Sequence, residues 1–357
     1  MKINLNKTEL EKCENLLNAK EQNISAADFY IEYLTEHFAD IKFAKNEHDF
    51  YQKMLDVMSA SEDQQEIKEI NNVCHIDKIE KLNTDIYLKD PYFSVIKDIK
   101  AKEGNWQFLN LHYEAYEGFV YNELEIENNY FGEHTPIGYF EKAFNYPAVI
   151  ENDTIWMSLI PHEIETMKKP IENAHGNVLV LGLGLGYYLY RILGKNEVKS
   201  VDVVEIDKRI ISLFNKYLIN KFPHIEKINV IHADAVEYVG NSKKHYDYVF
   251  ADIWHNVGDG EMLYLKLKPK EKEWTTTTFD YWIETSILAM LRRQTLTVFS
   301  EQLDGMKEED YLIAKNENDK IINKIYFYHK NTIVDSYGAL HDLLTDSSLK
   351  EMAKHLF

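Results

Sequence analysis

The chain has 357 residues, of which 45% are hydrophobic and 13% aromatic, so its composition is that of a folded protein and excludes a disordered or collagen-like chain. Its formal net charge is −19, and it contains no long run of Lys and Arg. Because nucleic acid and anionic membranes are bound by clustered basic residues, neither partner is expected. Residues 1–10 lack the apolar run of a signal peptide, and Cys13 and Cys74 form no metal or disulfide pattern. These features predict a cytoplasmic protein with no membrane span and no metal site.

The chain divides into regions of different character. Residues 1–100 are predicted to form a helical region, because apolar residues recur at helical spacing from Leu10 onward. Residues 101–172 are predicted to form a small β-rich region, because apolar and polar residues partly alternate between positions 119 and 124. Residues 301–357 are predicted to be a helical C-terminal region.

Between residues 173 and 300, short apolar runs alternate with helical segments. This rhythm predicts βαβ units and an α/β domain with a Rossmann-like, doubly wound, mostly parallel sheet. The expected strands are 177–181, 201–206, 228–232 and 246–251, with a fifth at 295–299. The expected helices are 187–193, 207–221 and 279–293.

A glycine-rich loop follows the first expected strand of this domain and contains Gly182, Gly184 and Gly186. Glycine lets a nucleotide cofactor approach the backbone closely, and the N–H groups of the following helix can hold the cofactor. Dinucleotide-binding folds place a further glycine where this chain has Tyr187. The loop therefore favours an S-adenosylmethionine pocket and disfavours a nicotinamide dehydrogenase.

Acidic residues follow the second and third strands. Glu205 ends the second strand, where a carboxylate can accept hydrogen bonds from both ribose hydroxyls of an adenosine. Asp207 is placed to cap the next helix instead. After the third strand, Asp234 can accept from the adenine amine, and the Ala235 N–H can donate to a ring nitrogen. These residues complete the predicted cofactor site.

The end of the fourth strand is expected to face the reacting carbon, because polar groups at strand carboxyl ends line the crevice of open α/β sheets. Asp252 and His255 are the candidate catalytic residues at this position. Trp254 lies between them and is the candidate substrate-binding wall. A base is required only if the nucleophile arrives protonated, and either candidate can serve.

These features in this order resemble the class I S-adenosylmethionine-dependent methyltransferase superfamily, and the layout is most similar to its spermidine synthase branch. The resemblance is carried by Val178–Gly182, Val203–Asp207, Asp234-Ala235 and Tyr246–Asp252. Spermidine synthases usually carry an Asp inside the glycine loop, where this chain has Leu185. They also follow the fourth strand with Asp-x-x-Asp-Pro, whereas this chain has His255 and Asn256 in place of the second Asp and the Pro.

The leading functional hypothesis from the sequence is methyl transfer from S-adenosylmethionine to a small molecule or peptide. One alternative is a spermidine synthase-like aminopropyltransferase that uses decarboxylated S-adenosylmethionine. An alternative of another class is a non-catalytic protein that binds the nucleoside cofactor. The sequence predicts no oligomeric state.

Overall fold

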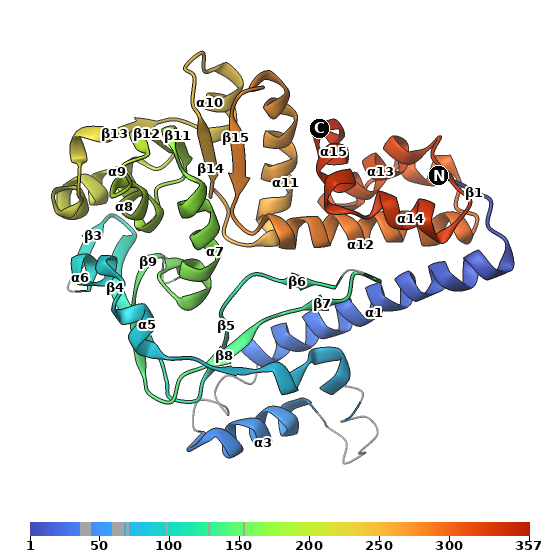
Figure 1. Ribbon diagram of the computed structural model, residues 1–357, viewed down its shortest axis with the longest axis horizontal. Helices are drawn as coiled ribbons and strands as arrows, with labels where there is room; N and C mark the ends of the chain where they lie inside the picture. The colour runs from blue at the N-terminus through green and yellow to red at the C-terminus, as the bar shows by residue number, and fades with distance from the viewer. Residues whose placement is uncertain (36–43, 59–67, 69–70, 98, 128, 153) are drawn as a thin grey trace.

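The computed structural model describes residues 1–357 except 36–43, 59–67, 69–70, 98, 128 and 153 (Figure 1). The first hundred residues are mostly helical. Their elements are β1 (Lys2–Ile3), α1 (Lys7–Thr35), α3 (Glu47–Met58), a 3-10 helix (Ile76–Lys78), β2 (Glu80–Lys81), α5 (Thr84–Leu88) and α6 (Pro91–Ile96). Asp90 caps α6 by accepting a hydrogen bond from the Tyr92 N–H at 2.9 Å, and Pro91 occupies the first turn.

The following residues form small antiparallel sheets ahead of the main domain. Their strands are β3 (Ala101–Glu103), β4 (Trp106–Tyr113), β5 (Gly118–Val120), β6 (Glu125–Ile126), β7 (Glu133–His134), β8 (Ile137–Tyr139), β9 (Phe144–Glu151) and β10 (Thr154–Ser158). The largest of these sheets has the strand order β10-β9-β4-β3. The hairpin of β9 and β10 leads directly into helix α7 (Pro161–Asn173), which packs against the main domain.

The main domain is the predicted Rossmann-like α/β fold. Its five strands are β11 (Gly176–Leu181), β12 (Val198–Glu205), β13 (Ile228–His232), β14 (Tyr248–Ala251) and β15 (Thr278–Tyr281). They are all parallel in the order β13-β12-β11-β14-β15. The α-helices between them are α8 (Tyr187–Leu193), α9 (Lys208–Leu213), α10 (Ala235–Asn241) and α11 (Val257–Leu267), and short π and 3-10 turns extend α9 and α11. The chain winds outward from β11 in both directions, so α8 and α9 cover one face of the sheet and α10 and α11 the other (Figure 1).

The strand ends determine where a ligand can bind. Leu181 at the end of β11 pairs with Val204 of β12 on one side and Ala251 of β14 on the other. The residues that follow these three strands therefore meet at one edge of the sheet. The order of strands reverses between β11 and β14, and such a switch point is where open α/β sheets bind ligands.

Two expectations about the end of this domain were wrong. Residues 295–299 are not a strand but part of helix α12 (Glu284–Leu303), and the fifth strand is β15. The predicted helix from residue 279 begins only at Glu284. The β-branched residues are accommodated in the helix because the Thr295 and Thr297 hydroxyls donate to carbonyls four residues earlier, at 2.8 and 3.0 Å.

The C-terminal region is helical and lies beside the N-terminal strand (Figure 1). Its elements are a 3-10 helix (Glu308–Leu312), α13 (Glu317–His329), β16 (Ile333–Val334), α14 (Tyr337–Leu343) and α15 (Asp346–Leu356). Strand β1 pairs in parallel with β16, and α1 contacts both α12 and α14. The two ends of the chain are thus packed together. No helix among the described residues has the length and apolar character needed to cross a membrane.

Candidate active site

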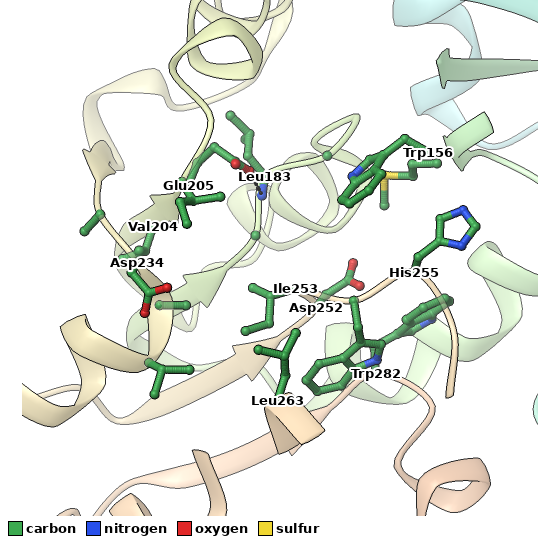
Figure 2. Close-up of a pocket in the computed structure, with 18 of the residues that line it drawn as sticks. Trp156, Leu183, Val204, Glu205, Asp234, Asp252, Ile253, His255, Leu263 and Trp282 are labelled. Carbon is green, nitrogen blue, oxygen red and sulfur yellow. Dashed lines mark hydrogen bonds between the residues drawn. The ribbon is translucent and has the colours of Figure 1, made fainter. Parts of the chain in front are cut away.

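A cavity of about 200 Å³ lies at the carboxyl ends of β11, β12 and β14 (Figure 2). Its floor is the glycine loop, and acidic residues from the ends of β12 and β14 face into it. The β9–β10 hairpin, α7 and α11 supply further walls through Trp156, Met157, Glu163 and Leu263. Among the described residues that line the cavity, none is Lys or Arg. The cavity is therefore suited to a ligand with cationic or neutral groups rather than a phosphate.

The three glycines of the loop all have positive φ, but they have different neighbours. A Cβ on Gly182 would lie 1.9 Å from the carbonyl oxygen of Asp252, so that position requires glycine for close backbone packing. A Cβ on Gly184 would lie 2.2 Å from Sδ of Met157, a flexible side chain that a ligand can displace. Gly186 packs against Phe222 and lies behind the loop rather than at the cavity wall.

Glu205 is buried at the end of β12 and faces the cavity beside the loop (Figure 2). Its Oε2 accepts a hydrogen bond from the Leu183 N–H at 3.1 Å, and its Oε1 accepts one from the Asp207 N–H at 2.8 Å. Burial raises the pKa of Glu205 although these hydrogen bonds act in the opposite direction. Each carboxylate oxygen can accept a second hydrogen bond, so the residue can still bind a pair of hydroxyls.

Asp207 caps α9, as the sequence predicted. Its Oδ1 accepts a hydrogen bond from the Arg209 N–H at 2.8 Å, and its Oδ2 accepts one from Trp106 Nε1 at 3.1 Å. The Arg209 guanidinium lowers the pKa of Asp207 through its hydrogen bond and charge. The carboxylate is thus occupied by partners outside the cavity.

Asp234 has two features that bear on its predicted role. It caps α10, since its Oδ1 accepts a hydrogen bond from the Glu237 N–H at 2.8 Å. It also lines the cavity together with Ala235. Beside them Ile206 lines the cavity and is 64% exposed, an apolar surface on which a flat ring can stack. Contact of the two predicted residues with an adenine remains a proposal.

The Asp252 carboxylate follows β14 and points into the cavity (Figure 2). Burial raises its pKa to about 7, and the negative charge of Glu205 adds to this shift. Glu163, in the first turn of α7, also lines the cavity and is buried. Burial, followed by the charge of Asp252, raises the pKa of Glu163 well above its usual range. In the unliganded cavity, Asp252 is therefore the acid of this pair that ionises near neutral pH.

His255 and Trp254 are placed differently from each other. His255 Nε2 lies 2.8 Å from the Ile155 carbonyl oxygen, so this nitrogen carries the hydrogen and donates a hydrogen bond. The imidazole thereby connects the end of β14 to the β9–β10 hairpin. The His255 ring lies 5.8 Å from that of Trp156 at the cavity rim. Trp254 is buried and stacks on Tyr281 with ring centroids 6.3 Å apart. Asp252 points into the cavity, whereas His255 is bonded to the hairpin, so Asp252 is better placed to transfer a proton. A catalytic role of His255 remains a prediction.

Sequence reasoning did not find the part of the cavity that precedes the main domain. Trp156, Met157 and Glu163 lie before the glycine loop in the chain, and Trp282 lies after the last strand. The local signal at Glu163 is an acidic residue in the first turn of an amphipathic helix, a pattern that is common to many helices. Among the described residues, no group of His, Cys, Asp and Glu side chains is arranged to hold a metal ion.

Comparison with known proteins identifies relatives of this segment. The sequence model of the spermine/spermidine synthase domain matches residues 160–269. The polyamine aminopropyltransferase of Clostridium botulinum is 32% identical over 92 residues, which cover 25% of this chain and 32% of that protein. The polyamine aminopropyltransferase of Methanocaldococcus jannaschii is 35% identical over 92 residues, covering 25% and 31%. The chain thus spans about a third of the length of these relatives.

A solved structure with a similar portion is the spermidine synthase from Thermotoga maritima. It has 16% sequence identity and a TM-score of 0.32, over 41% of this chain and 54% of that one.

These comparisons correct the leading hypothesis from the sequence. The matched segment contains the glycine loop, Glu205, Asp234 and Asp252, and its relatives are aminopropyltransferases. The predicted methyl transfer, with S-adenosylmethionine as the methyl donor, is therefore wrong. The prediction failed because both reactions start from the same adenosyl sulfonium, so residues suited to an adenosine do not distinguish one reaction from the other. The segment is similar to the spermidine synthase branch, as the residues of the loop and strand ends suggested.

Proposed function

We propose that this protein transfers an aminopropyl group from decarboxylated S-adenosylmethionine to an amine acceptor. The observation that carries the proposal is the Asp252 carboxylate, which points into a cavity shared with the glycine loop and Glu205. The similarity of residues 160–269 to the spermine/spermidine synthase domain supports the same reaction. The backbone at Gly182 and Gly184 and the acceptor pair on Glu205 fit an adenosine moiety.

The donor supplies a carbon activated by a sulfonium, and the sulfur takes the bonding electrons and leaves as the neutral thioether of 5′-methylthioadenosine. One C–S bond breaks and one C–N bond forms. The attacking nitrogen requires a lone pair, yet alkylamines are protonated near pH 7. Asp252 accepts that proton, because its raised pKa of about 7 makes it a better base than an exposed Asp. The apolar walls formed by Trp156, Trp254 and Trp282 exclude water and can stabilise a cation.

The acceptor class follows from the charges near Asp252. The relatives carry polyamine in their names, which suggests an aliphatic amine with one or more ammonium groups. In this chain His255 occupies the position of the second acid that the resemblance leads one to expect. An imidazole carries no negative charge, and the His255 ring is bonded to the Ile155 carbonyl. It therefore does not attract a distant ammonium as a carboxylate would. We therefore propose that monoamines and short diamines are accepted about as well as long polyamines.

The test is incubation of the purified protein with decarboxylated S-adenosylmethionine and a panel of amines, including putrescine, spermidine and a simple alkylamine. Mass spectrometry should detect 5′-methylthioadenosine and the aminopropylated amine in equal amounts. The Asp252→Asn variant should lower kcat by about a hundredfold or more, as expected for loss of a general base. Binding of the donor without any product across the panel would reject catalysis and favour a binding protein.

A further inference from the structure

The glycine loop contributes no charge to the cavity. The residues between its glycines are Leu183 and Leu185, and Leu185 is 1% exposed. The aminopropyl group of the proposed donor ends in a primary ammonium. Burying this charge is costly unless an opposite charge or hydrogen-bond acceptors pair with it. A carboxylate from another element is needed to bind this ammonium.

Glu163 places a carboxyl group beside the glycine loop. It lines the main cavity and also a small adjoining hollow that is bordered by Leu185 and Met157. Its side chain therefore lies next to the uncharged part of the loop. It comes from α7, whose first turn follows directly on the β9–β10 hairpin.

One oxygen of the Glu163 carboxyl group lacks a hydrogen-bond partner among the described residues. Glu163 is 9% exposed, and its Oε2 atom is buried with no hydrogen-bond partner among the described residues. A buried carboxyl oxygen without a hydrogen bond is costly, and such groups in a cavity are commonly completed by a ligand. Glu163 interacts electrostatically with Asp252 and Tyr113, and His162 is its titratable neighbour in the sequence. Burial lowers the pKa of His162 to about 4, so this neighbour supplies no cation at neutral pH.

We infer that Glu163 binds the terminal ammonium of the donor's aminopropyl group and selects the decarboxylated donor. The inference rests on the proposed function. The raised pKa of Glu163 keeps its carboxyl protonated in the unliganded cavity, and a bound ammonium favours the ionised form. Glu163 then receives the donor cation, while Asp252 remains available for the acceptor nitrogen. The undecarboxylated donor has a carboxylate beside the same ammonium, and this charge is repelled by Glu163 and Asp252 together. Selection against S-adenosylmethionine thus follows from two adjacent acids in a cavity whose described lining residues include no Lys or Arg.

The experiment is titration calorimetry with three ligands: decarboxylated S-adenosylmethionine, S-adenosylmethionine and 5′-methylthioadenosine. The last ligand has the nucleoside but no aminopropyl ammonium. The variant Glu163→Gln keeps the shape and removes the charge. The matched control Glu172→Gln makes the same change on the exposed side of the same helix. Glu163→Asp keeps the charge on a shorter side chain.

Glu163→Gln should weaken binding of the decarboxylated donor about tenfold or more, because a charge-assisted contact is lost. Binding of 5′-methylthioadenosine should change less than about twofold, and the preference over S-adenosylmethionine should shrink. Glu172→Gln should bind like the wild type, and Glu163→Asp should bind the decarboxylated donor more tightly than Glu163→Gln.

Equal donor affinity in Glu163→Gln and the wild type, with aminopropyl transfer intact, would overturn the inference and leave the proposed function standing. A parallel loss of 5′-methylthioadenosine binding would also overturn it, since Glu163 would then act on the fold of the pocket. If the donor binds as described but no amine is converted, the inference stands and the proposed function fails. Absence of any donor binding by the wild type would reject both.

Discussion

The backbone of Gly182 lies against the backbone of Asp252, so closely that a Cβ on the glycine would be 1.9 Å from the Asp252 carbonyl oxygen. The Asp252 N–H also donates to the Leu181 carbonyl at 2.8 Å. The glycine loop therefore positions the candidate base as well as providing room for a ligand. A side chain at position 182 would have to move the strand end that carries Asp252.

This contact predicts a difference between two alanine variants. Gly182 and Gly305 both have positive φ, but a Cβ on Gly305 meets no atom within 4 Å. Gly305→Ala should therefore cost only the conformational strain, about 1–2 kcal/mol. Gly182→Ala should cost about 1–3 kcal/mol more, because a backbone oxygen must shift. Urea unfolding measures both, and equal losses of stability would show that the loop and the strand end are not tightly packed.

Glu205 is predicted to bind the ribose of the nucleoside. Glu205→Gln should weaken 5′-methylthioadenosine binding by about one to two decades, because a charge-assisted acceptor is lost. Asp207→Asn is the matched control, since Asn also caps helices and Asp207 is bonded to Arg209 and Trp106 outside the cavity. Titration of each variant provides the comparison. The opposite ranking would place the ribose on Asp207.

The raised pKa of Asp252 predicts how pH affects activity. The value of kcat/KM reports ionisation in the free enzyme, so aminopropyl transfer should rise with pH through about 7 as Asp252 loses its proton. Rate measurements with both amine and donor well below their KM values, between pH 5 and pH 9, test this. A profile that falls over this range would exclude Asp252 as the base.

The same group predicts how pH affects stability. An unfolded Asp ionises near pH 3.9, whereas folded Asp252 ionises at about 7. Its contribution to stability is fully present below the unfolded pKa and is lost as pH rises from about 4 to about 7. Asp252→Asn removes this loss, so the unliganded variant should have a Tm a few degrees above the wild type at pH 8 and no advantage at pH 4. Thermal unfolding at the two pH values gives the comparison, and a constant difference would assign the effect to packing.

His255 is predicted to determine which acceptors are used. His255→Asp places a carboxylate at the cavity rim, so kcat/KM for putrescine relative to a monoamine should rise about tenfold. His255→Asn is the control, because it also removes the contact between the imidazole and the Ile155 carbonyl but adds no charge. If the two variants change the ratio equally, the effect comes from the loosened hairpin and not from charge.

Local sequence patterns predicted the parallel sheet and the side of the cavity that the glycine loop and Glu205 line. Strands buried on both faces of a parallel sheet are mostly apolar runs, and β11, the second half of β12 and β14 can therefore be predicted from local sequence. The glycine loop and Glu205 follow directly on two of those runs, so their place at the sheet edge comes with the strands. The rest required information that is not local in the chain.

The residues that face the glycine loop across the cavity depend on tertiary packing. Glu163 comes from a helix ahead of the main domain, and nothing in its local pattern distinguishes a buried wall of a cavity from an ordinary acid in a first helical turn. Its burial and its neighbour Asp252 depend on how α7 packs against the sheet. Similarly, the β-branched residues near Thr295 form a helix because they are packed among other helices and their hydroxyls bond along it. Burial and packing are long-range terms, and they outweigh the weak local preferences on which a sequence prediction depends.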